Sequence, residues 1–173
     1  MSSFNADDEV RNIYKKNKEC FKKLKQKLPS YIKSFPIKKT ELTKAVIARK
    51  SNLKTISSIV HPLVRKKMKI FINKNKNTKY IVLDVPLILE NKLNKKGDIL
   101  IFVKTSPKKI LNRLNKRSNF NKNIFRKLIN NQMSLQKKIK LSNYIIENNF
   151  PPDTVKKKVI LLKKKIMHER NCS

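Results

Sequence analysis

The chain of 173 residues contains one glycine, two histidines and two cysteines. A phosphate-binding loop of the pattern GxxxxGK[ST] needs two glycines, so a sequence whose single glycine is Gly97 cannot contain one. Neither His61 nor His168 has a second ligand beside it, which argues against a zinc site. Cys20 and Cys172 lie near opposite ends without metal-ligand spacing, so we expect reduced thiols and a cytoplasmic protein that folds without disulfides.

Acidic residues are also scarce. The chain has 11 Asp and Glu and 44 Lys and Arg, which gives a formal net charge of +33. Such a charge binds nucleic acid by electrostatics alone. The basic residues, however, are mostly Lys, spread along nearly the whole chain with little aromatic interleaving. A coding sequence rich in A and T explains the same composition, because it favours Lys, Asn and Ile codons. Both interpretations stay open. We expect non-specific nucleic-acid binding, and anionic small molecules such as nucleotides are natural partners under either.

Long apolar runs are absent. No run approaches the roughly 20 residues that span a bilayer, and the start MSSFNADDEV lacks the charged beginning and apolar centre of a secretory signal. We therefore expect no membrane segment. We expect a soluble monomer with one ordinary domain core, or a core with a small insertion.

The first half of the chain has the apolar spacing of amphipathic helices. The pattern predicts helices over residues 7–28, 40–49 and 51–71. Pro29 and Pro36 interrupt the connection after the first helix. Pro62 should bend or restart the third helix, because proline removes a helical hydrogen bond.

The second half alternates short apolar runs with helical stretches. The runs over residues 80–84, 99–103 and 144–147 are short and apolar, as in buried parallel strands. Ser106 followed by Pro107 predicts the start of a helix that continues to about residue 117. Further helices fit residues 122–140 and 152–169. Strands separated by helices predict an α/β fold with a parallel sheet.

Two carboxylates follow the first of these strands, in the segment YIVLDVPLILEN. Ligands of parallel sheets bind beyond the carboxyl ends of the strands, which makes Asp84 and Glu90 candidates for a binding site. The alternative is that Asp84 caps the turn at Pro86 and that Glu90 lies on a solvated helix face. The local pattern leaves both interpretations open.

Two further charged groups have a functional and a simpler interpretation. Arg113 and Arg117 lie four residues apart on one predicted helix, so their guanidinium groups would share a face and can grip a phosphate. In so basic a chain the alternative is a solvated face. Asp7, Asp8 and Glu9 occupy the first turn of a predicted helix, where acidic side chains complement the helix dipole. Their spacing alone assigns no function to either group.

Taken together, these motifs occur in an order that resembles the dephospho-CoA kinase family, and the resemblance covers nearly the whole chain. Residues 5–7 (Asn-Ala-Asp) resemble the family's Asp-Ala-Asp signature. Residues 84–91 (DVPLILEN) are very similar to its Pro-Leu-Leu-x-Glu-Asn strand end. Three further segments match in order: residues 59–64 (IVHPLV), residues 113–117 (RLNKR) and residues 132–149, which contain Gln-x-Ser and NYIIENN.

The resemblance implies transfer of the γ-phosphate of ATP to the ribose 3′-hydroxyl of dephospho-CoA, the last step of coenzyme A synthesis, with Mg²⁺ as cofactor. Such a transfer depends mainly on positioning and charge neutralisation. By resemblance, Asp7 would be the general base that orients or deprotonates the hydroxyl, and Arg117 with Arg113 would bind the ATP phosphates. No protein metal ligand is expected. The residues that would line the acceptor site are His61, Asp84 and Glu90.

The fold implied by the resemblance is α/β: a P-loop kinase-like parallel sheet flanked by helices, with a helical insertion and a lid. Residues 1–11 and 74–173 would form the kinase core. Residues 12–73 would form the helical insertion on the acceptor side, and residues 113–138 the lid within the core.

One part of this fold has no counterpart in the sequence. A P-loop kinase begins with a strand, a GxxxxGK[ST] loop and a helix, together about 30 residues, which the family places before Asp7. We therefore expect an N-terminally shortened form, missing the first strand, the P-loop and the first helix, with little activity alone. Asn5 replaces the first Asp of the signature, and Ser142 with Asn143 replaces Ala-Asp, so these positions should carry no essential charge. Two alternatives remain: a basic nucleic-acid-binding protein on an inherited kinase scaffold, and an inactive kinase remnant.

Overall fold

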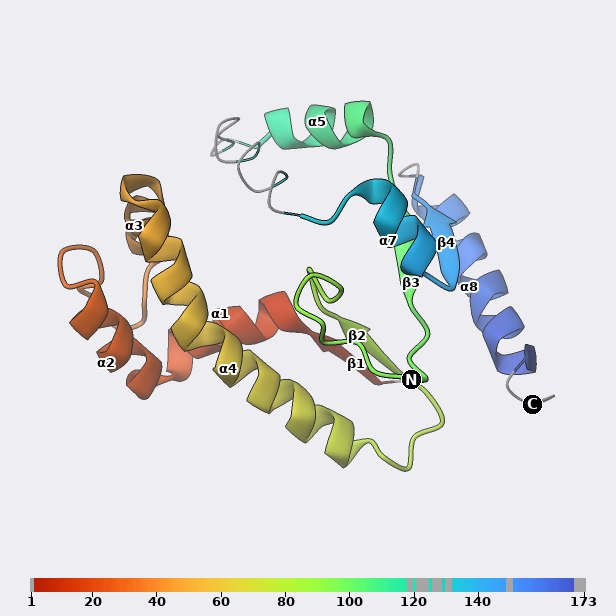
Figure 1. Ribbon diagram of the computed structural model, residues 1–173, viewed down its shortest axis with the longest axis horizontal. Helices are drawn as coiled ribbons and strands as arrows, with labels where there is room; N and C mark the ends of the chain where they lie inside the picture. The colour runs from red at the N-terminus through yellow and green to blue at the C-terminus, as the bar shows by residue number, and fades with distance from the viewer. Residues whose placement is uncertain are drawn as a thin grey trace. The chain divides into compact units, whose positions relative to one another are not determined.

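The computed structural model describes residues 2–117, 120, 125, 129, 132–148 and 151–169 (Figure 1). The chain divides into two compact units, Met1–Pro86 and Leu87–Ser173. Within the described residues, each unit contains one two-stranded parallel sheet accompanied by helices. This arrangement agrees with the predicted α/β class.

The sheet of the first unit pairs β1 (Ser2–Asn5) with β2 (Ile81–Asp84). The strands run parallel, and their register places Asn5 opposite Asp84. The apolar run over residues 80–84 predicts β2 correctly to within one residue. The sequence does not predict β1, because Phe4 is its only apolar residue and its partner strand lies 79 residues further along the chain.

The first predicted helix is divided at Asn17. α1 (Ala6–Lys16) and α2 (Lys18–Lys27) flank this residue, whose backbone is extended at φ −95° and ψ 96°. The Asn17 side chain accepts a hydrogen bond from the backbone N–H of Cys20 at 2.8 Å, as an N-cap residue does at the start of a helix. The prediction of one continuous helix over residues 7–28 is therefore wrong, because Asn17 ends one helix and begins the next.

α3 (Lys39–Ala48) and α4 (Lys50–Lys74) follow the predicted ranges closely. Pro62 lies inside α4, which is one helix from Lys50 to Lys74. Of the two predicted outcomes, a bend or a restart at Pro62, the restart therefore does not occur. Proline removes one hydrogen bond, but Ile56, Val60 and Met68 are buried on both sides of it. Packing of these side chains holds α4 together as one element.

The helices of the first unit enclose its main apolar core. Leu24 and Ile32 are 0% exposed, and full burial of a side chain of this size contributes about 1.5–3 kcal/mol. A smaller cluster of Phe4, Ala6 and Met68 packs β1 and the start of α1 against α4. The buried members of the main core are Ile13, Cys20, Leu24, Leu28, Ile32, Ile37, Ala45, Ile56 and Val60.

The sheet of the second unit pairs β3 (Ile101–Lys104) with β4 (Tyr144–Glu147), again in parallel. α8 (Pro152–Glu169) contacts β4. The strand predicted over residues 144–147 and the helix predicted over residues 152–169 are confirmed at both ends. The strand predicted over residues 99–103 is confirmed with a shift toward its carboxyl end.

Two shorter helices of this unit begin at serine N-caps. Ser106 accepts a hydrogen bond from the backbone N–H of Lys109 at 3.3 Å and precedes α5 (Pro107–Asn115), as predicted. Ser134 caps α7 (Leu135–Leu141) in the same way. A continuous helix over residues 122–140 is wrong, because residues 132–134 are not helical. Most of residues 118–131 lie outside the described residues.

The single glycine of the sequence occupies a turn before β3. Its φ of +92° is a conformation that strains residues with a side chain. The Asp98 carboxylate closes this turn by accepting a hydrogen bond from the backbone N–H of Lys95 at 2.7 Å. Gly97 therefore serves chain reversal. Separately, none of the helices in the described part of the chain is long and apolar enough to cross a membrane.

Candidate functional site

The carboxyl ends of β1 and β2 bring two polar side chains together. Because the strands are parallel, both chains leave the sheet at the same edge, where ligands of α/β proteins bind. Nδ2 of Asn5 donates a hydrogen bond to Oδ2 of Asp84 at 2.9 Å. The predicted position of Asp84 at a strand end is confirmed, and the structure adds a partner that the local pattern did not predict.

α1 begins directly at this edge. Oδ1 of Asn5 accepts a hydrogen bond from the backbone N–H of Asp8 at 3.0 Å and caps the helix. The Asp8 carboxylate forms an ion pair with Arg11, one turn further along. Asp7, the second residue of α1, receives no hydrogen bond or ion pair on its carboxylate from any described residue. Of the acidic residues in this turn, Asp7 and Glu9 therefore have no partner for their carboxylates among the described residues, and Asp7 is the closer of the two in sequence to the end of β1.

His61 lies in the middle of α4, within the first unit. Burial, together with the neighbouring Arg65, lowers the pKa of His61 below its ordinary value of 6.5. The imidazole is therefore neutral at pH 7 and can donate or accept a hydrogen bond. Among the described residues, the structure gives no hydrogen bond between His61 and either Asp7 or Asp84.

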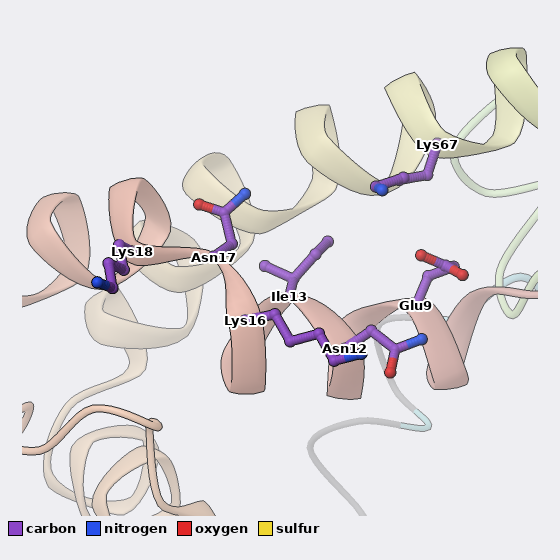
Figure 2. A pocket seen from close by; sticks show the side chains of 7 residues that line it. All are labelled: Glu9, Asn12, Ile13, Lys16, Asn17, Lys18 and Lys67. Carbon is purple, nitrogen blue, oxygen red and sulfur yellow. The ribbon is translucent and has the colours of Figure 1, made fainter.

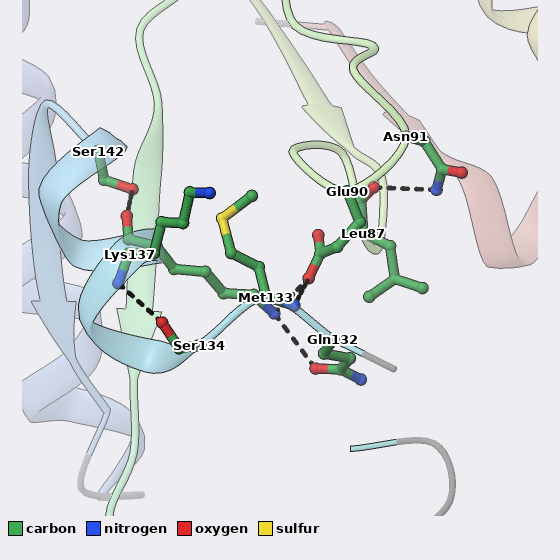
Figure 3. Close-up of polar contacts among 9 residues, drawn as sticks. Leu87, Glu90, Asn91, Gln132, Met133, Ser134, Lys137 and Ser142 are labelled. Atoms are coloured by element: carbon green, nitrogen blue, oxygen red, sulfur yellow. Dashed lines mark hydrogen bonds and ion pairs between the residues drawn. The ribbon is translucent and has the colours of Figure 1, made fainter. Parts of the chain in front are cut away.

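Glu90 lies in the turn after β2 and binds two groups at the start of α7 (Figure 3). Its Oε1 accepts the backbone N–H of Met133 at 3.1 Å and pairs with Nζ of Lys138 at 2.8 Å. Lys138 also donates to Oε1 of Gln132 at 3.2 Å. The side chains of Glu90 and Lys138 are only 16% and 17% exposed. The alternative of a solvated helix face for Glu90 is therefore wrong.

The electrostatics of Glu90 follow from these contacts. Burial alone opposes ionisation of the carboxyl and is the largest single influence. The hydrogen bonds from Lys138 and from backbone N–H groups, together with the charge of Lys138, outweigh it, and the pKa of Glu90 lies below its ordinary value of 4.5. Glu90 is thus a charged, enclosed and already paired carboxylate at neutral pH.

The turn that carries Glu90 has an unusual backbone. Leu87 and Lys92 adopt φ values of 59° and 51°, which are uncommon for residues with side chains. The carbonyl of Leu87 accepts hydrogen bonds from the backbone N–H of Asn91 at 3.0 Å and from its side-chain Nδ2 at 2.9 Å. These bonds stabilise the conformation. Such strain often accompanies functional turns.

The two predicted phosphate-binding arginines do not share a helix. Arg113 lies in the last turn of α5, which ends at Asn115. The backbone N–H of Arg117 donates to the carbonyl of Leu114 at 3.0 Å, in a turn beyond the helix. The prediction that both guanidinium groups lie on one helical face is therefore wrong, because the helix ends two residues before Arg117.

A groove of about 470 Å³ lies between α1 and α4 (Figure 2). Its position depends on packing of two helices far apart in the sequence, so no sequence pattern identifies it. Three ammonium groups against one carboxylate favour an anion there. No predicted site residue lines this groove. The lining residues are Glu9, Asn12, Ile13, Lys16, Asn17, Lys18 and Lys67.

Comparison with known proteins identifies the family. The family model described as dephospho-CoA kinase matches residues 1–152. The chain is 32% identical to the dephospho-CoA kinase of Wolbachia pipientis over 154 residues, which cover 88% of this chain and 78% of the relative. It is 28% identical to that of Bartonella henselae over 169 residues, or 96% and 86% of the two chains.

Solved structures support the same fold. The dephospho-CoA kinase from Campylobacter jejuni matches with a TM-score of 0.64 and 18% identity, over 98% of this chain and 87% of that chain. A Thermus thermophilus protein matches with a TM-score of 0.68 and 18% identity, over 95% and 84%. The predicted resemblance is thus confirmed, and this chain belongs to the dephospho-CoA kinase family of enzymes.

Proposed function

We propose that the protein transfers the γ-phosphate of ATP to the ribose 3′-hydroxyl of dephospho-CoA and forms coenzyme A. The observation that carries this proposal is the Asp7 carboxylate, which follows the carboxyl end of β1 in the first turn of α1 and has no partner among the described residues. Phosphoryl transfer needs one such group to orient the attacking hydroxyl, and otherwise depends on charge neutralisation.

Asp7 would act as the general base. Its carboxylate would accept the proton of the ribose hydroxyl as the bond from this oxygen to the γ-phosphorus forms and the bond from that phosphorus to ADP breaks. Arg113 and Arg117 would bind the phosphates of ATP. His61 and Asp84 would contact the acceptor, and the same role for Glu90 stays a prediction, although its Oε1 is already bound by Lys138.

Mg²⁺ would enter with ATP. Magnesium in such sites keeps several waters and binds one or two carboxylates together with substrate phosphates. The described residues include no cluster of three or more His, Cys, Asp or Glu that could hold a metal ion.

We further propose that residues 1–11 and 74–173 act as the kinase core. Residues 12–73, which include α2, α3 and most of α4, would hold the acceptor. Residues 113–138, which include both arginines, would act on the ATP side. The buried core formed by α1 to α4 supports a rigid platform for the acceptor.

The 173-residue chain should have little kinase activity alone. Its single glycine excludes a GxxxxGK[ST] loop, whose backbone N–H groups and Lys normally hold the phosphates. Without that loop, Arg113 and Arg117 would bind the phosphates of ATP but would not fix their orientation as well. The alternatives of a nucleic-acid-binding protein and of a kinase remnant gain no support from the family match, which concerns a kinase throughout residues 1–152.

A direct test measures coenzyme A formed from ATP and dephospho-CoA by chromatography, together with dephospho-CoA binding by calorimetry. We expect binding, and turnover well below the roughly 1–100 per second of ordinary kinases. Asp7→Asn should lower the residual rate about 100-fold or more and leave ATP binding unchanged. Asp8→Asn is the matched control, because Asp8 already pairs with Arg11.

Two outcomes would contradict these statements separately. Turnover at ordinary kinase rates by the purified chain would refute the low-activity proposal. Absence of both dephospho-CoA binding and any coenzyme A formation would refute the proposed function. If Asp7→Asn instead abolishes ATP binding, Asp7 belongs to the nucleotide or its magnesium and is not the base.

A further inference from the structure

The side chain of Asn5 uses both ends of its amide. Oδ1 accepts the backbone N–H of Asp8 at 3.0 Å, and Nδ2 donates to Oδ2 of Asp84 at 2.9 Å. The two bonds determine the orientation of the amide, because the helix cap requires an acceptor and the carboxylate requires a donor. One residue therefore connects the end of β2 to the first turn of α1.

Other residue types cannot make this connection. Aspartate can cap a helix but has no donor for a second carboxylate when it is ionised. Serine also caps helices well, but its side chain is too short to reach both groups. Among the common N-cap residues, asparagine alone carries its acceptor and its donor on two separate atoms, Oδ1 and Nδ2.

Charge adds a second reason. The first turn of α1 holds Asp7, Asp8 and Glu9, and Asp84 lies at the same edge of the sheet. A neutral donor at position 5 binds the Asp84 carboxylate without adding a fourth acidic side chain to the start of the helix. An aspartate there would place two like charges at hydrogen-bond distance, which disfavours ionisation of both.

We propose that Asn5 is a positioning residue, which holds the Asp84 carboxylate in a fixed place relative to the helical turn that carries Asp7. The inference rests on the proposed function, since Asp84 and Asp7 are the groups expected to meet the acceptor. Asn5 itself need not touch the substrate. Its contribution is to keep both carboxylates in one geometry before the acceptor binds.

Three variants separate the two bonds. Asn5→Ser keeps a helix cap and removes the donor to Asp84. Asn5→Asp keeps the cap and replaces the donor with a like charge. Asn17→Ser is the matched control for the stability measurements, because the Asn17 side chain caps α2 through the same kind of bond to Cys20 but has no second side-chain partner among the described contacts.

Dephospho-CoA binding to the full 173-residue chain is the first readout. Asn5→Ser should weaken binding about tenfold, which corresponds to the lower end of the contribution of one hydrogen bond to a charged group, and Asn5→Asp should weaken it further. In an Asp84→Ala background, Asn5→Ser should cause no additional loss. Unchanged binding in Asn5→Ser, or an undiminished loss in the Asp84→Ala background, would overturn the proposal.

A second readout does not depend on substrate. Urea unfolding of the single and double variants forms a double-mutant cycle between Asn5 and Asp84. We expect their effects to be non-additive, while hydrogen exchange at the Asp8 amide stays within about threefold in Asn5→Ser because the cap survives. Additive effects would refute the inference. If the unmodified chain neither binds dephospho-CoA nor forms coenzyme A, the proposed function fails and this cycle alone decides the role of Asn5.

Discussion

Replacement of Lys138 by methionine should destabilise the protein by about 3 kcal/mol. The Lys138 ammonium lies 2.8 Å from Glu90, and the two side chains are only 17% and 16% exposed. At this distance and an effective dielectric constant of about 20, two unit charges attract by about 6 kcal/mol. Desolvation of both ions costs several kcal/mol each, so the intact pair contributes little net stability.

The variant removes the attraction but not all of the desolvation. Methionine keeps most of the length and the apolar stem of Lys138, while Glu90 stays enclosed without its cation. Breaking a buried pair in this way costs about 3–5 kcal/mol. We expect the lower end of that range, because one oxygen of Glu90 keeps its bond to the Met133 N–H at 3.1 Å and both side chains retain some contact with water.

Urea unfolding at pH 7, followed by circular dichroism, measures the loss. The matched control is Lys23→Met, whose partner Glu19 also lies at 2.8 Å but whose pair is 60% and 70% exposed. An exposed pair of this kind contributes little to stability, because water and salt screen the two charges. If Lys138→Met loses no more free energy of unfolding than Lys23→Met, the enclosed pair has no special role and the reasoning is refuted.

The same pair has a defined pH dependence. The pKa of Glu90 in the folded chain lies below its ordinary value of 4.5, so the unfolded chain binds this proton more readily. The ionised Glu90 carboxylate therefore stabilises the folded chain fully above about pH 4.5, and this stabilisation is lost as the pH falls through the pKa that Glu90 has in the folded chain. The difference between the unmodified chain and Lys138→Met should therefore narrow below that pH. A constant difference down to pH 3 would contradict the assignment.

Two smaller predictions concern the first unit. Burial raises the pKa of Cys20 to about 11, so its alkylation by iodoacetamide at pH 8 should be about 100-fold slower than that of a free thiol; peptide mass spectrometry follows this site, and rapid labelling would contradict the burial. Asn17→Ala should lower the free energy of unfolding by about 1 kcal/mol, and Asn17→Ser by much less, because only alanine removes the cap of α2. Equal losses in urea unfolding would show that the cap is not the cause.

The sequence predicts those elements whose signal is local. β2 and β4 are short apolar runs, and α5 starts at a serine and a proline, so composition is enough to find them. β1 has no such signal, because two of its four residues are serines and its stability comes from pairing with β2. The break between α1 and α2 is also hidden, since the apolar spacing continues across Asn17 while its side chain caps the next helix.

The candidate site was only partly predictable for the same reason. Their position after a predicted strand makes Asp84 and Glu90 candidates for a binding site, but the residues that they bind lie far from them in the sequence. Asp84 binds Asn5, 79 residues away, and Glu90 binds the Met133 amide, 43 residues away. Only the fold decides which carboxylate is enclosed and which is left for a ligand. For Arg117 the prediction failed for a different reason. Residues 113 and 117 have helical spacing in the sequence, but α5 ends at Asn115, before Arg117.

Asn5 and Asn143, the two asparagines expected to stand in place of aspartates in two motifs of the family, differ in what their side chains bind. Oδ1 of Asn143 accepts the backbone N–H of Leu100 at 2.7 Å, and its own N–H donates to the Leu100 carbonyl at 2.8 Å. An aspartate side chain could accept the same bond, so the neutral residue is not required there. Asn5 uses its side-chain donor as well, toward a carboxylate, and an aspartate could not. A neutral side chain is therefore not needed at position 143. At position 5, in contrast, the amide donor of the neutral side chain is the group that binds the Asp84 carboxylate.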